Sequence, residues 1–282
     1  MYSFKKFRVS IFSNLFRKPV IQEHDDSPHA GFHDKSYTTF LHSGKAGDII
    51  YSLPTVMELN RHAGNISMYL NIIQPHNNKI DKHFGQKAVQ MLIPLLEHQS
   101  YISRCSLYNN ESYEINLDAF RNIPILLDRN SLARWYFFAF NVHPDLDKPW
   151  LEAETLPEFK DKIIITRSKR YKNPNISHGF LNQYDDLIFI GLDQEYKNIS
   201  KEIRNIQHVK VNDFLEMANI INSCRLFIGN QSFPYAIAEA LKVSRLLEVS
   251  LDSPNIIPYG PNGYDFLYQD AFEELVKELI IK

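Results

Sequence analysis

The stretch that decides the fold begins Thr38-Thr-Phe-Leu-His-Ser-Gly-Lys-Ala-Gly-Asp48 and continues Ile49-Ile-Tyr-Ser-Leu-Pro-Thr-Val-Met-Glu-Leu59. Residues 38–41 favour a β-strand, and a loop with Gly44 and Gly47 follows them. After Asp48 the apolar residues recur at the spacing of a helix. A strand, a glycine loop and a helix together place backbone N–H groups and a helix N-terminus beside a ligand. We therefore predict that this stretch forms one half of a ligand site, with Lys45 and Asp48 at its edge.

A second unit of this kind reads Leu226-Phe-Ile-Gly-Asn-Gln-Ser-Phe-Pro-Tyr-Ala-Ile-Ala-Glu-Ala-Leu241. Its strand leads to Gly229, and the turn that follows consists of Asn230, Gln231 and Ser232. Ser232 is a favourable N-cap, and a proline in the first helical turn loses no hydrogen bond. The N-terminus of such a helix suits a diphosphate. We expect Glu239, on the second turn, to accept hydrogen bonds from ribose hydroxyls; the alternative is an ordinary capped helix with a solvated glutamate.

A basic cluster follows a third strand, in the run Ile165-Thr-Arg-Ser-Lys-Arg-Tyr-Lys172. The carboxyl ends of parallel strands face the ligand crevice, and arginine binds phosphate oxygens in a bidentate manner. We therefore expect phosphate contacts from Arg167 and Arg170, although a solvated basic loop would show the same pattern. A further strand, 187–191, ends on Gly191.

Strands alternate with helices along the whole chain, which predicts parallel sheets joined by crossover helices. We predict an α/β protein with two facing Rossmann-like domains and a cleft between them, which is the expected ligand site. The first domain spans residues 37–150 and the second spans residues 151–282. Residues 143–157 contain three prolines and are typical of an interdomain connection.

Residues 1–36 form a separate extension and linker, in which residues 1–18 interleave aromatic and basic side chains. This pattern is typical of an amphipathic helix that lies on an anionic membrane surface, or of a helix that packs on the protein's own body. The chain has 282 residues and a net charge of −2, which argues against nucleic-acid binding through general electrostatics. Two cysteines make no disulfide framework or metal cluster, so we expect a cytoplasmic protein, in peripheral contact with the inner face of a membrane if residues 1–18 bind lipid.

Two common phosphate-binding motifs are excluded. A P-loop needs serine or threonine directly after its lysine, whereas Ala46 follows Lys45. The dinucleotide motif Gly-x-Gly-x-x-Gly is missing as well, because only two residues separate Gly44 from Gly47 and no third glycine follows in register.

The two half-sites together resemble the heptosyltransferase-like glycosyltransferases of family 9. The residues that carry this resemblance are Gly47-Asp48, Pro54 and Leu59, which match the family signature Gly-Asp-x5-Pro-x4-Leu, together with the turn and helix from Phe227 to Leu241. The family usually has Asp-Ser-Gly in that turn, where this chain has Asn230-Gln231-Ser232. The resemblance extends over roughly residues 37–270 and implies the GT-B architecture of two Rossmann-like domains.

The resemblance implies an inverting sugar transfer from a nucleotide-activated donor to an acceptor hydroxyl. Asp48 would be the general base, although a first-turn acid that only stabilises its helix would occupy the same position. Arg167, Arg170, the helix end at Ser232 and Lys45 would stabilise the leaving diphosphate without a metal ion. No cofactor is expected besides the nucleotide sugar, which is the substrate.

The acceptor stays open among a glycan, a lipid-linked sugar, a protein and a modified nucleic-acid base. The altered turn leaves two other functions open. One is a non-catalytic nucleotide-sugar-binding protein, and the other is a sugar-nucleotide epimerase of the same architecture.

Overall fold

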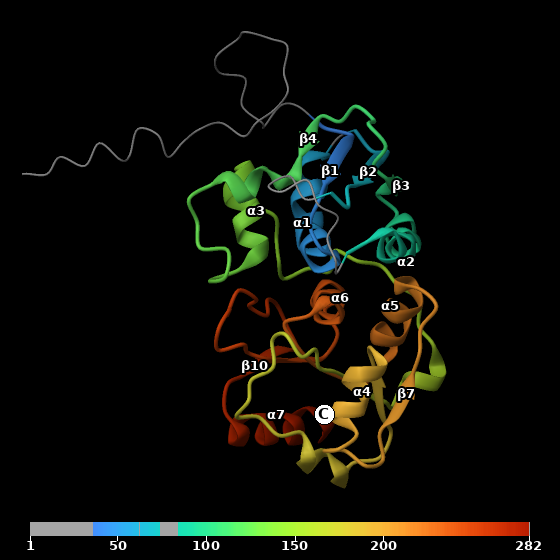
Figure 1. Ribbon diagram of the computed structural model, residues 1–282, viewed down its shortest axis with the longest axis vertical. Helices are drawn as coiled ribbons and strands as arrows, with labels where there is room; N and C mark the ends of the chain where they lie inside the picture. Colours follow the sequence, from blue (N-terminus) through green and yellow to red (C-terminus); the bar gives the residue numbers. More distant parts are fainter. Residues whose placement is uncertain (1–35, 62, 74–83, 282) are drawn as a thin grey trace, which may run out of the picture.

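The computed structural model describes residues 36–61, 63–73 and 84–281 and confirms the α/β class, with two parallel sheets in two lobes (Figure 1). The predicted amphipathic segment 1–18 lies outside the described residues, and its role stays a prediction. Among the residues described, no helix combines the length and apolarity needed to cross a membrane.

The first lobe contains a four-stranded sheet in the order β3-β2-β1-β4, in which every pair is parallel. Its strands are β1 (Thr39–His42), β2 (Ile66–Leu70), β3 (Ile102–Leu107) and β4 (Ile115–Asn116). The accompanying helices are α1 (Ala46–Leu59), α2 (Gln86–Glu97), the 3-10 helix η3 (Leu117–Asn122) and α3 (Leu132–Phe140). The predicted strand and helix of the opening stretch are therefore present, and α1 begins three residues earlier than its apolar period suggests.

The second lobe contains a six-stranded parallel sheet in the order β10-β9-β8-β5-β6-β7. Its strands are β5 (Ile163–Thr166), β6 (Leu187–Ile190), β7 (Gln207–Val209), β8 (Leu226–Asn230), β9 (Arg245–Glu248) and β10 (Gly263–Phe266). The helices are η4 (Pro157–Phe159), η5 (Gly179–Gln183), α4 (Asp193–Ile199), α5 (Phe214–Ser223), α6 (Phe233–Leu241) and α7 (Gln269–Ile281). Read from β7, this is the strand order of a complete Rossmann sheet.

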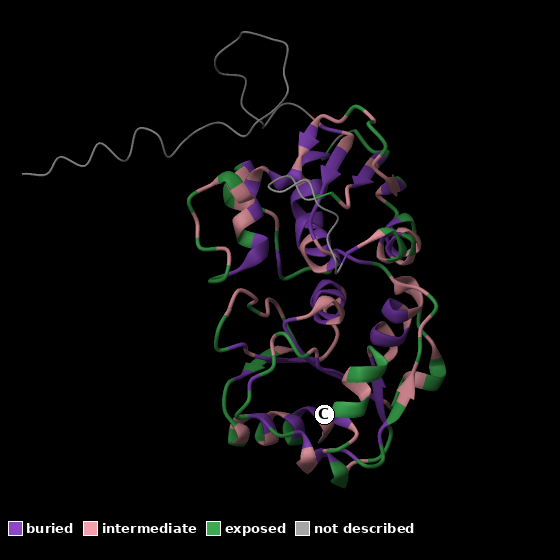
Figure 2. Cartoon of the chain, in the orientation of Figure 1, coloured by how far each residue is buried: buried purple, intermediate pink, exposed green. Residues whose placement is uncertain are grey.

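The lobes meet through a layer of helices, in which α1 packs on α6 and α2 packs on α5 (Figure 1). One hydrophobic core cluster runs from the first sheet through this layer to β8. Residues 235–240 of α6 are all buried, because α6 lies between its own sheet and α1 (Figure 2). A Cβ added to Gly47 would lie 3.9 Å from Cα of Phe233, so the N-terminal turns of α1 and α6 come together.

The cap of α5 differs from the expected one. The sequence favours Asn212 as the cap, because an apolar helical period follows it over residues 213–222. The helix begins one residue later, with the Asp213 carboxylate accepting the backbone N–H of Glu216 at 2.8 Å. The Glu216 carboxylate accepts the backbone N–H of Asn212 in return, at 2.6 Å. Two adjacent residues with cap-forming side chains make this boundary ambiguous in the sequence.

Candidate functional site

Each sheet contains a point where the strand order reverses, and the loops that leave the two strands there form a crevice. In the first sheet this point lies between β1 and β4, so the loops 43–48 and 117–121 lie together. In the second sheet it lies between β5 and β8, which joins the loop 167–171 to the turn 231–233. The four segments contribute to the cavities between the lobes.

Two adjoining cavities lie between these segments. The helix-end cavity, of about 440 Å³, is lined by residues at the N-terminal turns of α1 and α6. The Arg121 cavity, of about 330 Å³, lies on the side of η3 and α3. Both are lined by Lys45, Asp48, Leu132, Arg170, Tyr171 and Asn255. A ligand that spans the two cavities would therefore contact both lobes.

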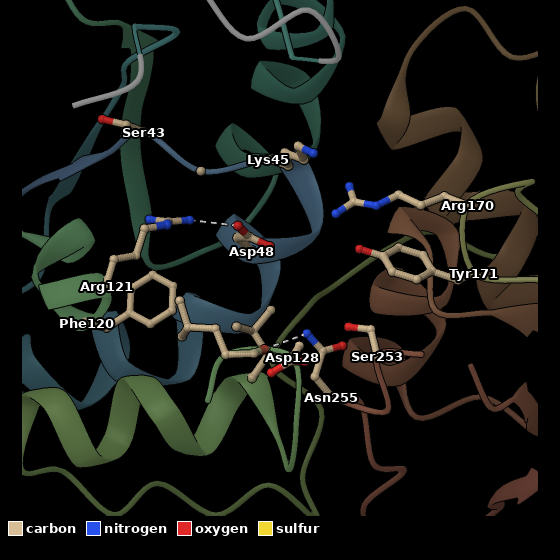
Figure 3. A pocket seen from close by; sticks show the side chains of 13 residues that line it. Ser43, Lys45, Asp48, Phe120, Arg121, Asp128, Arg170, Tyr171, Ser253 and Asn255 are labelled. Carbon is tan, nitrogen blue, oxygen red and sulfur yellow. Dashed lines mark hydrogen bonds and ion pairs between the residues drawn. The ribbon is translucent and has the colours of Figure 1, made fainter. Parts of the chain in front are cut away.

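Asp48 lies in the first turn of α1, at the junction of the two cavities. Its Oδ2 accepts a hydrogen bond from Arg121 at 2.7 Å, and Oδ1 has no hydrogen-bond partner among the residues that the structure describes (Figure 3). The guanidinium of Arg121 is also ion-paired with Asp118, whose second oxygen accepts the backbone N–H of Ser43 at 2.9 Å. Asp48 is thus held in place through one oxygen and presents the other oxygen to the cavity.

His42, at the end of β1, fixes the loop before Asp48. Its Nδ1 accepts the backbone N–H of Gly44 at 2.7 Å, so Nε2 is the protonated nitrogen and donates to the hydroxyl of Tyr136 at 2.7 Å. Burial, with the charge of Arg121, lowers the pKa of His42 to about 3. Gly44 is required here, because an added Cβ would lie 2.3 Å from His42 Cε1. The neutral histidine is part of the loop's support and is sealed from solvent.

Arg170 and Tyr171 approach Asp48 from the second lobe (Figure 3). The Arg170 guanidinium lies 4.7 Å from the centre of the Tyr171 ring, and burial raises the pKa of that tyrosine. Lys45, the residue before α1, lines the same space. The structure therefore brings together Lys45, Asp48, Arg170 and Ser232, as the sequence predicted, in or beside one cleft.

Arg167 is placed differently from the prediction. It is buried, and its guanidinium donates to both carboxylate oxygens of Glu248, at 2.7 and 2.9 Å, and to two backbone carbonyls. It borders a neighbouring cavity of about 590 Å³, where Glu202 pairs with it at 3.4 Å. A strand-end arginine looks like a phosphate ligand in the sequence, but Glu248 comes from β9, a strand whose position the sequence does not reveal.

Glu239 does not reach the cavities, which corrects the expected ribose contact. It is 0% exposed, and its carboxylate pairs with Arg245 at 2.6 Å and with Lys242 at 2.5 Å. Because α6 is covered by α1, its second turn faces protein on all sides. The buried Arg245 at the start of β9 requires this carboxylate as its counter-charge.

The turn 229–232 is structural in part. Asn230 is fully buried and joins β8 to the loop after β5, with its amide bonded to the backbone N–H and C=O of Ser168 at 3.0 and 2.7 Å. The Gln231 amide is bonded to Ser250, Ser253 and Asn255, although the residue lines the helix-end cavity. Ser232 lines that cavity, and its hydroxyl does not cap α6.

The loop glycines separate into two groups. Gly44 and Gly47 line the cavities; an added Cβ would be crowded by His42 at Gly44, whereas at Gly47 its nearest neighbour would be 3.9 Å away. Gly191 and Gly229 lie within the packing of the second sheet, where an added Cβ would meet the Phe189 ring and Thr166 Oγ1, at 2.8 and 2.7 Å. Gly191 and Gly229 therefore allow close packing within the second sheet.

Several site residues were not predicted from the sequence, namely Asp118, Arg121, Tyr171, Glu195 and Asn255. Glu195, on α4, lines the helix-end cavity; burial raises its pKa, against hydrogen bonds from the backbone of Leu192 and Lys169 that lower it. The sequence pattern could have indicated Arg121, because the run Asn116-Leu-Asp-Ala-Phe-Arg121 follows the end of a strand, and Asp48 also follows a strand end. Asn255 lies in an irregular segment and has no such signal.

Solved structures with the same fold are bacterial glycosyltransferases. A glycosyl transferase family 9 structure from Veillonella parvula is 12% identical, with 88% of this chain and 90% of that chain covered and a TM-score of 0.55. The E. coli heptosyltransferase WaaC with ADP-2-deoxy-2-fluoro heptose is 7% identical, with 86% and 99% covered and a TM-score of 0.57. The E. coli ADP-heptose LPS heptosyltransferase II is 12% identical, with 86% and 98% covered and a TM-score of 0.50.

The chain matches no protein-family model, and no curated protein sequence matches it. The likeness therefore shows the fold, and it confirms the two-lobed heptosyltransferase-like architecture that the sequence resemblance implied. Within the residues described, no group of three or more His, Cys, Asp or Glu side chains is arranged to hold a metal ion.

Proposed function

We propose that the protein is a glycosyltransferase that moves a sugar from a nucleoside-diphosphate donor to an acceptor hydroxyl, with inversion and without a metal ion. The observation that carries this proposal is the meeting of two helix N-termini beside a carboxylate. A Cβ added to Gly47 on α1 would lie 3.9 Å from Cα of Phe233 on α6, and Asp48 lines the same cavity. Backbone N–H groups at helix ends bind anions, and a diphosphate placed there lies next to the base.

The leaving group is stabilised by charges from both lobes. Lys45 and Arg170 line the cavity into which the helix ends open, and Ser232, at the N-terminus of α6, lines it too. Cations and oriented N–H groups in a partly closed cleft stabilise the negative charge that develops on a departing diphosphate. Arg167, Asn230 and Glu239 take part only by holding the surrounding loops, because their side chains are bonded within the protein.

Asp48 is the proposed general base. Its free Oδ1 faces the cleft, while Arg121 keeps the other oxygen in place. A hydroxyl that attacks the anomeric carbon must lose its proton, and a positioned carboxylate removes it at a benefit of about 10²- to 10⁴-fold. The acceptor would enter through the Arg121 cavity, which lies on the side of Asp48 away from the helix ends, and its class stays open among glycan, lipid-linked sugar, protein and modified base.

The test uses a panel of nucleoside diphosphates and sugar nucleotides, headed by ADP sugars because a structural neighbour was solved with an ADP-heptose analogue. Thermal shifts identify the ligand, since selective binding to the native state raises its stability. The release of nucleoside diphosphate is then followed with water as the acceptor, with and without EDTA. NMR of the released sugar before it equilibrates gives the anomer and therefore tests inversion.

Asp48→Asn should bind the sugar nucleotide normally, but it should turn the donor over to nucleoside diphosphate about 10²- to 10⁴-fold more slowly. Asp128→Asn is the matched control, because Asp128 lines the Arg121 cavity and pairs with Arg129 instead of facing the helix ends. Full activity in Asp48→Asn would remove the base assignment. Binding without any turnover would favour a nucleotide-sugar-binding protein, and an isomerised sugar nucleotide would favour an epimerase.

We expect the reaction in the cytoplasm, where sugar nucleotides are available in a reducing environment. Membrane contact through residues 1–18 stays a prediction, and vesicle co-sedimentation with and without these residues tests it.

A further inference from the structure

A segment of the second lobe, residues 250–255, is fastened to the turn before α6. The Gln231 Nε2 group donates to the backbone O of Ser253 at 2.7 Å and to Oδ1 of Asn255 at 2.9 Å. The backbone N–H of Ser250 donates to Gln231 Oε1 at 2.7 Å. Gln231 is almost fully buried, so these hydrogen bonds are protected from solvent. The side chain that replaces the family's usual serine in this turn therefore anchors a loop.

The same segment also bonds to the first lobe. Nδ2 of Asn255 donates to the backbone O of Leu127 at 2.8 Å, and the backbone N–H of Leu132 donates to the backbone O of Asn255 at 2.9 Å. Asn255 thus connects the turn at Gln231 to residues 127–132 with its amide group and its own carbonyl. We name this set of contacts the Asn255 bridge.

Other contacts beside the bridge keep the lobes together more weakly. Arg129 donates to the backbone O of Asp252 at 2.8 Å, and Arg134 lies 4.8 Å over the ring of Tyr259. Arg129 is exposed, so its contact contributes little to holding the loop. Asn255 is therefore the residue through which the two loops are joined most directly.

The bridge forms one wall of the Arg121 cavity. Leu127, Asp128 and Leu132 line that cavity from the first lobe, and Ser253 and Asn255 line it from the second (Figure 3). Asn255 also lines the helix-end cavity, which ends at Gln231 and Ser232. A shift of the turn at the N-terminus of α6 would accordingly be passed to the wall beside Asp48.

We infer that Asn255 is a positioning residue that couples binding at the N-terminus of α6 to the shape of the cavity beside Asp48. The ligand at that end is the nucleoside diphosphate of the proposed function, on which this inference rests. Binding there orders the Gln231 turn, the turn holds Asn255, and Asn255 holds residues 127–132 against the cleft. The acceptor cavity is then held in this shape most firmly when the donor is bound, which reduces transfer to water.

Hydrogen–deuterium exchange on the full chain tests the bridge first without ligand. Asn255→Asp keeps the size and the acceptor for Gln231 but loses the donor to Leu127 O and opposes that carbonyl with a negative charge. We expect amides 127–132 to exchange about tenfold faster, which is about the effect of losing one hydrogen bond. Asn205→Asp is the matched control, because the Asn205 amide donates to Tyr184 O, within the second lobe, and to no other group in the part of the chain that the structure describes. Unchanged exchange at 127–132 in Asn255→Asp would overturn the bridge.

The second measurement adds ADP, or another nucleoside diphosphate that the thermal shifts identify. In the natural chain and in Asn205→Asp, the nucleotide should slow exchange at 231–236 and also at 127–132. In Asn255→Asp it should slow exchange at 231–236 alone, which a merely structural role would not produce. Protection of the natural chain confined to 231–236 would refute the coupling and leave donor binding intact. If no nucleotide slows exchange at 231–236, both the proposed donor binding and the coupling are refuted. The exchange measured without ligand would then still test the Asn255 bridge.

Discussion

Replacing Arg167 with alanine should strongly lower the free energy of unfolding. Nucleotide affinity should be retained, because we assign the phosphate contact to Arg170. The Arg167 and Glu248 side chains are 4% and 1% exposed and are 2.7 Å apart, so the substitution leaves a buried carboxylate without its cation. Breaking a buried ion pair in this way costs about 3–5 kcal/mol of unfolding free energy. At about 2–4 °C per kcal/mol for a chain of this size, the melting temperature should fall by about 6–20 °C.

The pH dependence of this loss identifies its cause. Burial already raises the pKa of Glu248, while Arg167 opposes that rise. Without Arg167, the pKa of Glu248 in the folded state moves further above its value in the unfolded chain. The free energy of unfolding therefore falls as pH rises through that folded-state pKa. The destabilisation should therefore be smaller at pH 5 than at pH 8. Adding Glu248→Gln should restore part of the stability, because an amide can still accept the backbone N–H of Asn173, which Glu248 accepts at 2.6 Å.

The assay combines scanning calorimetry with isothermal titration of the nucleoside diphosphate that binds. Arg170→Ala is the matched variant, since Arg170 stacks on Tyr171 and lines the cleft. It should melt near the natural temperature and bind the diphosphate more weakly. If Arg167→Ala instead melted normally and lost nucleotide binding, Arg167 would be the phosphate ligand and our assignment would be wrong.

Three further predictions concern the loop at Asp48 and the cap of α5. Gly44→Ala places a Cβ 2.3 Å from His42 Cε1, so it should abolish sugar-nucleotide turnover but keep nucleotide binding. Gly85→Ala, whose added Cβ has no atom within 4 Å, should leave both turnover and binding unchanged, as release rates and titration would show. The natural chain should lose stability as pH falls from 6.5 toward 3, because the pKa of His42 is lowered to about 3 and only the unfolded chain takes up its proton. The unfolding free energy, measured with urea at each pH, should depend less steeply on pH in His42→Asn, by up to about 1.4 kcal/mol per pH unit. An unchanged dependence on pH would contradict the buried neutral histidine. Asp213→Ala should lower the unfolding free energy by about 0.5–2 kcal/mol in the same assay and Asn212→Ala by less, because the Asp213 side chain caps α5 at 2.8 Å; equal losses would restore Asn212 as the cap.

Local pattern was sufficient for the fold class and for one half of the site. The opening strand, its glycine loop and α1 are recognisable because period-2 and period-3.6 patterns are local properties of the chain. That pattern places Asp48 at the junction of loop and helix, and the structure puts it in the first turn because α1 begins at Ala46. Arg170 and Ser232 could also be placed, because a residue just after a buried parallel strand lies at the crevice edge of its sheet.

The partners of the charged side chains were decided by the tertiary structure. Arg167 and Arg170 follow the same strand, and only the approach of Glu248 from β9 makes the first structural and leaves the second in the cleft. Glu239 is removed from the site because α1 covers α6, a contact between lobes that no local period encodes.

Arg121 and Asn255 belong to the site for the same reason, since each meets one partner across 73 or more positions of sequence. A salt bridge or a bridging amide depends on distances that exist only after both sheets have formed and packed. The residue types along the chain therefore specify which chemistry is available, and the packing of the two lobes selects which of those residues the cleft can use.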